Sequence, residues 1–323
     1  MSLKTLINYL FLFGVFLIPS ALAFATFFLL VSSIFGTIFW RKNLNNLINK
    51  SIIFAALLLI FICFCQSVVS LTTKEYNPQL TWTGLFNWLP LFLLFLGSQT
   101  FLQTPKERKL TGIVLIAGSF PVLLTGFGQY FFNWHGPFEA FNGLIIWFQR
   151  PIDKGSVTNG LTGLFNNLNY AGCWLSIIWP FCIASFFEKT KNVIHKSFSS
   201  SFLIAVLVAI LLTTSRNAYG GLLLTLPILI GNSSLFWLFP LGFIFYFSGN
   251  FLSEMQLDFI QNNYAMSTIL DKIQGLKEIG NDPRLLIWGN SLEMISQKPI
   301  LGWGAGVYPI IFLNKYGFPA NHS

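Results

Sequence analysis

Long apolar runs alternate with short polar segments along most of the chain, and this pattern predicts helices that cross a membrane. A helix needs roughly 20 residues to span a bilayer, and tilt or burial in protein accommodates the shorter runs. Because the runs are continuous and do not alternate residue by residue, they favour helices over a β-barrel. The predicted spans cover residues 5–18, 21–40, 51–70, 85–103, 110–132, 169–187, 198–212, 217–231 and 235–248.

The chain beyond the last predicted span has a different pattern, which indicates helices lying on a membrane surface. Acidic, amide and apolar residues alternate at helical spacing over residues 252–279, and another helix is predicted over residues 284–296. The second helix carries its apolar residues on one face, at Leu285, Trp288, Leu292 and Ile295. We therefore expect an all-α, polytopic membrane protein in which residues 1–248 form a bundle of about nine spans and residues 249–323 a long external helical loop.

Composition excludes a soluble globule. The chain has 323 residues, of which 54% are hydrophobic and 9% charged, whereas about 25% of the residues of soluble domains are charged. The mean hydropathy of +0.65 agrees with this. The formal charge of +8 does not indicate nucleic acid as a partner, because the cations fall in short loops between predicted spans.

The distribution of those cations predicts which side of the membrane each loop faces. Basic residues gather in alternate loops, near residues 41–50, 106–109 and 189–196, while the other short loops hold few. Cytoplasmic loops carry the excess of Lys and Arg, so the N-terminus is predicted inside, and Arg216 and the long C-terminal segment outside. Residues 1–23 also resemble a cleavable secretory signal, but the apolar run that follows at once favours an uncleaved helical hairpin.

Arg216 and Arg284 each stand where a helix is predicted to begin. Arg216 precedes an apolar run, and Arg284 follows Asp282 and Pro283, which suit the cap and the first position of a helix. A helix start carries partial positive charge, so a cation there is unfavourable by up to about 1 kcal/mol. An anion bound between the two reverses this penalty, because helix starts are natural phosphate sites. The placement predicts a phosphate-bearing ligand. The alternatives are an interfacial anchor for Arg216 and an ordinary solvated helix residue for Arg284.

The predicted external loop over residues 133–168 is rich in turn formers and amide side chains. One asparagine at its end is expected to cap the next helix, and the others are suited to binding sugar hydroxyls or phosphate. Arg150 in the same loop is either an exposed cation or a supporting phosphate contact. The candidate supporting residues are Asn166, Asn167, Asn169 and, directly before Arg216, Ser215.

The sequence holds no pattern that favours a metal or a cofactor. The three His residues are scattered, and the four Cys residues lie within apolar runs. Alternating glycines at Gly302, Gly304 and Gly306 suggest a dinucleotide site only superficially, because no strand is predicted before them and no acidic partner follows at the right distance. A tight turn is favoured.

Five segments together resemble the O-antigen ligase and polymerase superfamily, which includes lipopolysaccharide O-antigen ligases and related cyanobacterial proteins. Their order and spacing on this hydropathy background are fairly specific, although each segment alone is a weak signal. The resemblance covers the chain from about residue 150 to the end, and the first half agrees only in its pattern of spans. The segments are TGLFNNLNYA at 162–171, TSRNAY at 214–219, RLLIW at 284–288, KPILGWGAG at 298–306 and NHS at 321–323.

This resemblance implies a GT-C type fold and transfer of a glycan from a polyprenyl pyrophosphate to a hydroxyl of a lipid A core, at the periplasmic face and without nucleotide or metal. It implies that Arg216 and Arg284 hold the pyrophosphate, and that His322 in the external loop acts on the acceptor hydroxyl. A pyrophosphate leaves readily once its charge is neutralised, and a base with a pKa near neutrality suits the attacking hydroxyl. The expected partners are a lipid-linked glycan donor, a glycolipid acceptor and the bilayer of a bacterial inner membrane.

Several alternatives stay open. Members of the superfamily carry further spans after a His-Asn pair, so the chain looks C-terminally truncated, and an inactive remnant is one reading. A polymerase that extends a glycan is a variant of the same chemistry. A transporter of a bicarbonate-like anion belongs to another class, but it is expected to place charged residues near the middle of a span, and the predicted spans show essentially none.

Overall fold

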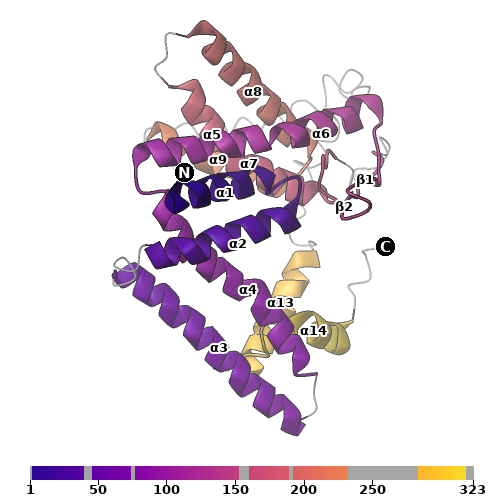
Figure 1. Cartoon of the computed structure of the whole chain (residues 1–323). Coiled ribbons are helices and arrows are strands. Elements are labelled where there is room, and N and C mark those ends of the chain that lie inside the picture. Colours follow the sequence, from indigo (N-terminus) through magenta and orange to yellow (C-terminus); the bar gives the residue numbers. More distant parts are fainter. Residues whose placement is uncertain are drawn as a thin grey trace, which may run out of the picture. The chain divides into compact units, whose positions relative to one another are not determined.

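Helices make up most of the structure, a computed structural model (Figure 1). It describes residues 2–39, 46–73, 77–152, 160–188, 192–231 and 283–317. Within these ranges the one sheet is a small antiparallel pair, in which β1 (Phe138–Ala140) lies against β2 (Ile145–Trp147). Six of the described helices or joined helices are long and apolar enough to cross a membrane. The expected all-α, multi-pass membrane protein is thus confirmed.

The helices follow the predicted spans to within a few residues at most ends. Their bounds are α1 Leu3–Leu17, α2 Leu22–Phe39, α3 Leu47–Thr73, α4 Gln79–Ser98 with the 3-10 turn η2 Gln99–Phe101, α5 Pro105–Gly118, α6 Phe120–Phe132, α7 Leu168–Phe186, α8 Val193–Leu212, α9 Arg216–Ile230, α13 Pro283–Gln297 and α14 Tyr308–Tyr316. The ninth predicted span and the amphipathic stretch over 252–279 lie outside the described residues.

One predicted span differs from the single helix that the apolar run indicates. Where the run predicts one helix over 110–132, the structure has a helix that begins earlier, at Pro105. It is interrupted at Ser119, between the end of α5 and the start of α6. Pro121 has no N–H to continue the helical bonding, and the Ser119 N–H bonds the Ile116 carbonyl at 3.1 Å instead. The two helices still form one candidate span of 28 residues.

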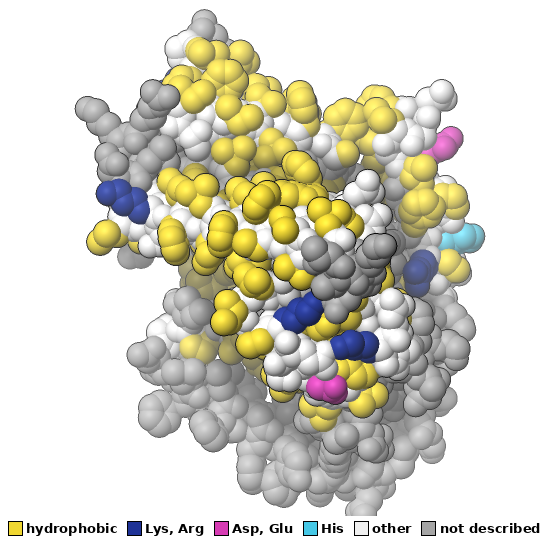
Figure 2. Space-filling view, turned by 90° about the horizontal axis from the view of Figure 1, so that it is seen from below, with side chains coloured by type: hydrophobic (Ala, Val, Ile, Leu, Met, Phe, Trp, Pro, Cys, Tyr) yellow, Lys and Arg dark blue, Asp and Glu magenta, His cyan; other side chains and the backbone are white. Residues whose placement is uncertain are grey.

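Large apolar side chains are widely exposed on the helices, as expected of surfaces that meet lipid. On α3 the exposed fractions are 66% for Phe54, 59% for Leu57 and 59% for Phe61. Figure 2 shows hydrophobic side chains over wide areas of the face in view, with only a few charged ones among them. Soluble monomers rarely expose apolar patches of this extent, so the surface agrees with a membrane location.

The chain divides into two compact units. Unit 1 comprises residues 1–11, 27–105 and 278–323, and unit 2 comprises residues 12–26 and 106–277. This division groups segments that contact one another. The predicted division at residue 248 concerns the side of the membrane and stays a prediction.

Unit 2 is built on α7, which packs against both α8 and α9. Leu175 and Ile178 of α7 and Val206 and Ile210 of α8 are all fully buried in its core. Small residues bring the backbones together, because a Cβ added at Gly172 of α7 would lie 2.9 Å from side-chain carbons at the start of α9. Close packing through small residues is the usual way in which helices associate where lipid supplies no hydrophobic drive.

Unit 2 has two ends, which α8 joins over 20 residues, or about 30 Å. At one end, which we call the basic end, the start of α5 meets the end of α7 through an ion pair between Lys109 and Glu188. At the other, which we call the site end, α6 and α8 finish and α7 and α9 begin. Leu161, just before α7, donates its N–H to the carbonyl of Leu212, at the end of α8, at 2.8 Å. Antiparallel spans therefore bring Arg150 and Arg216 to the end that the Lys109 cluster does not occupy.

In unit 1 the glycine-rich segment over 302–306 packs against α4. A Cβ at Gly84 of α4 would lie 2.3 Å from the Gly306 nitrogen, and one at Gly306 would lie 2.4 Å from the carbonyl oxygen of Leu80. Gly302 and Gly304 adopt positive φ, at 65° and 106°, which glycine tolerates without strain. The predicted tight turn between α13 and α14 is confirmed, and its glycines serve turn geometry and close packing.

Candidate functional site

The turn between α8 and α9 is short, strained and buried. Thr214 has a φ of 54°, a conformation that costs a residue branched at Cβ about 1–3 kcal/mol. Thr213, fully buried, donates its hydroxyl to the carbonyl of Ile210 at 2.7 Å and accepts the N–H of Ser215 at 3.3 Å. These bonds hold the left-handed turn, which sets the direction in which α9 departs.

Arg216 is the first residue of α9, as predicted, and its side chain is half-buried. Ser215 precedes it as the cap residue and is 1% exposed. The Ser215 hydroxyl donates to the side-chain carbonyl of Asn169 at 2.9 Å. The start of α9 is thereby tied to the first turn of α7, next to the arginine.

The asparagines at the start of α7 have different roles. Asn167 caps the helix, since its side-chain oxygen accepts the N–H of Asn169 at 2.7 Å. This confirms the prediction that one of them serves as a cap. Asn169 then accepts the hydroxyl of Ser215, and Asn166 is exposed in the bend before the helix.

Gln129 holds the loop that carries Arg150 through hydrogen bonds. Its role is not predicted by the sequence. It is 1% exposed, near the end of α6. Its amide nitrogen donates to the carbonyl of Arg150 at 2.7 Å and to the hydroxyl of Thr162 at 2.9 Å. Its amide oxygen accepts the N–H groups of Thr162 at 2.8 Å and Gly163 at 3.2 Å. The signal in the sequence that could have identified Gln129 is that it is an amide among the largely apolar residues at the end of α6.

The same loop fits closely against the ends of α6 and α8. Gly160 lies so near the Thr213 carbonyl that an added Cβ would be 2.3 Å from its oxygen. Gly163 has a φ of 58°, and a Cβ there would lie 2.8 Å from the carbonyl oxygen of Val122. Leu161 between them is fully buried in the core. The loop therefore has little freedom to move without breaking the core contacts of Leu161.

Gln149 adds a second anchor one residue before Arg150. It is 2% exposed, donates its amide to the carbonyl of Thr125 at 2.9 Å, and accepts the N–H of Gly136 on its backbone carbonyl at 2.8 Å. The backbone of Arg150 is thus held on both sides, while its side chain is exposed. Both open interpretations of Arg150, loop cation and phosphate contact, agree with this placement.

Arg284 is the second residue of α13 in unit 1, and the helix begins at Pro283 as predicted. Arg216 belongs to unit 2, so the pairing of the two arginines stays a prediction. Asp282 and His322 lie outside the described residues. Among the residues that the structure does describe, no three His, Cys, Asp or Glu side chains are grouped to hold a metal ion.

The predicted apolar face of α13 is largely open. Trp288, Leu292 and Ile295 are 62%, 66% and 58% exposed, while the opposite side of the helix packs on α14 through Met294, which is 1% exposed. An exposed apolar face beside a packed one agrees with a helix lying at a membrane surface.

Comparison with known protein families gives a match in the second part of the chain. A family model described as O-antigen ligase matches residues 201–323, which include the turn before α9, Arg216 and Arg284. No curated protein and no solved structure matches the chain. The match supports the resemblance that the motifs indicate. Residues 201–323 of this multi-pass membrane protein are therefore similar to the O-antigen ligase family, which supports an O-antigen ligase-like superfamily for the chain.

Proposed function

We propose that this protein is a glycosyltransferase of the O-antigen ligase type. It transfers a glycan from a polyprenyl pyrophosphate to a hydroxyl of a lipid A core or of another glycan, on the membrane face where the site end lies. The observation that carries the proposal is Arg216, half-buried at the first position of α9 and fixed by the bond between Ser215 and Asn169. The family match over residues 201–323 supports the class of reaction.

Arg216 stabilises the leaving group in this scheme. The acceptor hydroxyl oxygen attacks the anomeric carbon of the donor glycan, and the bond from that carbon to the pyrophosphate oxygen breaks. The electron pair leaves with the polyprenyl pyrophosphate, whose developing charge faces a guanidinium and the partial positive charge at the start of α9. A fixed cation at this point costs no reorganisation during the reaction, which is why the rigid turn before it matters.

Arg284 and His322 complete the proposed chemistry from the other part of the chain. Arg284, in the first turn of α13, supplies a second cation for the same pyrophosphate, and Arg150 supports the phosphate from the loop. His322 takes the proton of the attacking hydroxyl. Asn166 and Asn169 present amide groups for sugar hydroxyls.

The position of charges along the spans favours transfer at a membrane face over anion transport. In the six candidate spans, Lys50, Lys196 and the cluster over 106–109 fall within the first five residues of their helices. A transport path through the bilayer is expected to place ionisable residues near the midplane. The described spans place them at the ends.

Substitution of the two arginines tests the proposal. In a bacterial strain that lacks its own ligase and makes a lipid-linked glycan which this chain accepts, glycan on lipopolysaccharide is measured as the ladder on gels. We expect Arg216→Ala and Arg284→Ala each to lower transfer about a hundredfold, as loss of one transition-state contact does. Arg216→Lys keeps the charge but not the fork of N–H donors, so it retains more activity than Arg216→Ala.

The matched control is Lys196→Gln, which removes one cation from the basic end and is expected to leave the ladder unchanged. Protein level in the membrane is measured for every variant, so that a loss of transfer is not a loss of protein. Ladders of normal intensity in both alanine variants would refute the proposal.

A further inference from the structure

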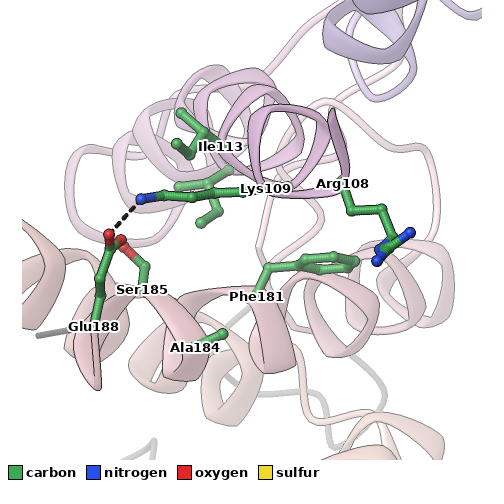
Figure 3. A pocket seen from close by; sticks show the side chains of 9 residues that line it. Arg108, Lys109, Ile113, Phe181, Ala184, Ser185 and Glu188 are labelled. Carbon is green, nitrogen blue, oxygen red and sulfur yellow. Dashed lines mark hydrogen bonds and ion pairs between the residues drawn. The ribbon is translucent and has the colours of Figure 1, made fainter. Parts of the chain in front are cut away.

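A pocket at the basic end of unit 2 has no part in the proposed transfer. It is a cavity of about 400 Å³ between the start of α5 and the end of α7, within the range of about 300–1,000 Å³ that is typical of small-ligand sites. Figure 3 shows Arg108 and Lys109 reaching it from α5, with Phe181, Ala184 and Glu188 on the other wall.

The deeper part of the pocket is lined by apolar side chains on the outer surface of the helices. Ile113 of α5 and Phe181 of α7 are 47% and 37% exposed, and both line the cavity. Gly112 makes room for the Phe181 ring, since a Cβ added there would lie 3.0 Å from its Cδ1. In a bilayer an apolar hollow of this kind on a helix surface is filled by a hydrocarbon chain.

The mouth of the pocket carries a net positive charge. Lys109 is paired with Glu188 and remains 56% exposed, and Arg108 adds a second cation, which lies on the far side of Phe181 from Lys109 in Figure 3. The residues that line the pocket include two cations and one carboxylate, a net formal charge of +1. Lys106 and Lys196 begin the helices on the same end. An apolar hollow under cations fits an amphiphile with an anionic head.

We propose that this pocket binds an anionic phospholipid, with one acyl chain along Ile113 and Phe181 and the phosphate at the basic mouth that Arg108 and Lys109 form. Charge selects the head group, because basic residues at the membrane surface attract anionic lipids, whereas a zwitterionic head gains little. The apolar cavity accommodates the acyl chain, and Gly112 leaves the space for it. The site is independent of the proposed glycan transfer.

Native mass spectrometry of the full chain, purified in detergent, tests this proposal with two added lipids. Phosphatidylglycerol and phosphatidylcholine of identical acyl chains are titrated, and the fraction of lipid-bound protein is measured. We expect phosphatidylglycerol to bind at about tenfold lower concentration. Arg108→Gln together with Lys109→Gln is expected to abolish that preference, because the attraction of both cations is lost.

Gly112→Leu tests the cavity separately from its charge. It fills the space beside Phe181 and leaves every cation in place, and we expect it to weaken phosphatidylglycerol binding about tenfold. Gly112→Ala, the smaller change, is expected to weaken it less and covers the case in which leucine prevents folding. Lys106→Gln, at the same end but outside the lining, is expected to retain the preference. Equal binding of the two lipids by the unaltered protein would overturn the proposal, and so would unchanged binding in both Gly112 variants.

Discussion

The two ends of unit 2 are held together by different kinds of interaction. At the site end a buried amide, Gln129, makes four hydrogen bonds to a loop, and a buried hydroxyl, Ser215, joins two helix starts. At the basic end the polar contact between α5 and α7 is an ion pair of two partly exposed side chains, Lys109 and Glu188, beside the packing of Phe181 against Gly112. Removing one partner of a buried hydrogen bond costs far more than removing one partner of an exposed ion pair.

This difference suggests which end carries chemistry. Catalytic groups need positions fixed to a fraction of an ångström by surrounding residues, and the site end has such a frame, including a strained turn at Thr214. The ion pair at the basic end is partly exposed, which suits lipid contacts. The predictions below test the contrast, beginning with the largest effect.

The first prediction is that the two ends lie on opposite sides of the membrane. A single cysteine is placed at Asn217, exposed at the start of α9, or at Lys106, exposed at the start of α5, in a chain whose four own cysteines are replaced by alanine. In intact cells a membrane-impermeant maleimide is expected to label Asn217→Cys and to leave Lys106→Cys unlabelled. Permeabilised cells are expected to label both.

The labelling outcome is close to all-or-none, since a charged reagent does not cross the bilayer. The permeabilised sample shows whether a cysteine that is unlabelled in intact cells reacts once the reagent can cross the membrane. Labelling of Lys106→Cys and not Asn217→Cys in intact cells would invert the orientation that the basic loops predict, and labelling of both at equal rates would remove the contrast between the ends.

The second prediction concerns Gln129→Leu, which keeps the approximate size of the side chain and removes its hydrogen bonds. The carbonyl of Arg150 and the N–H groups of Thr162 and Gly163 lose their partner, and each unsatisfied buried group costs about 1–3 kcal/mol. We expect a loss of about 3 kcal/mol or more in the free energy of unfolding, measured by chemical denaturation in detergent, and a large loss of glycan transfer.

Gln129→Glu is the matched control at the same position. The carboxyl is expected to be neutral at this buried position, because an ionised one would bury an uncompensated charge. It still accepts the N–H groups of Thr162 and Gly163 but has one O–H donor where the amide has two N–H donors, so the loss is expected to fall between the unaltered chain and Gln129→Leu. If Gln129→Leu were as stable and as active as the unaltered chain, the loop would not depend on this amide, and the contrast between the ends would fail.

Features that depend on neighbours in sequence could be predicted. The start of α9 at Arg216, the start of α13 at Pro283 and an asparagine cap on α7 all follow from a few adjacent residues, and each is confirmed. The helices themselves follow from the apolar runs, because a bilayer imposes both their length and their internal hydrogen bonding.

Features that join distant segments could not be predicted from the sequence. The bonds of Gln129 connect residues 21 to 34 positions apart, and no local rule tells which backbone groups a buried amide will find. Gly84 and Gly306 meet although neither shows a partner in the sequence. The sequence analysis interpreted the glycines only as a turn, since the second reason for them, contact with α4, depends on the fold.

The last prediction concerns the ion pair at the basic end and has the smallest effect. Lys109 donates a hydrogen bond to Glu188, and this bond and the charges of Lys109 and His195 lower the pKa of the Glu188 carboxyl. A carboxyl whose pKa is lowered by folding stabilises the protein above its unfolded pKa, and the contribution is lost as the pH falls through the folded value. Because both groups are partly exposed, the contribution at pH 7 is about 0.5 kcal/mol or less.

Thermal unfolding in detergent measures that contribution as the difference between the unaltered chain and Lys109→Gln. We expect a difference of about 1 °C or less at pH 7, which disappears below the folded pKa of Glu188 and also in about 1 M salt, where charges are screened within about 3 Å. The loss caused by Gln129→Leu is expected to persist in the same salt, because buried hydrogen bonds are screened little. A Lys109→Gln difference that survives both acid and salt would mean that packing of the lysine stem, and not its charge, joins α5 to α7.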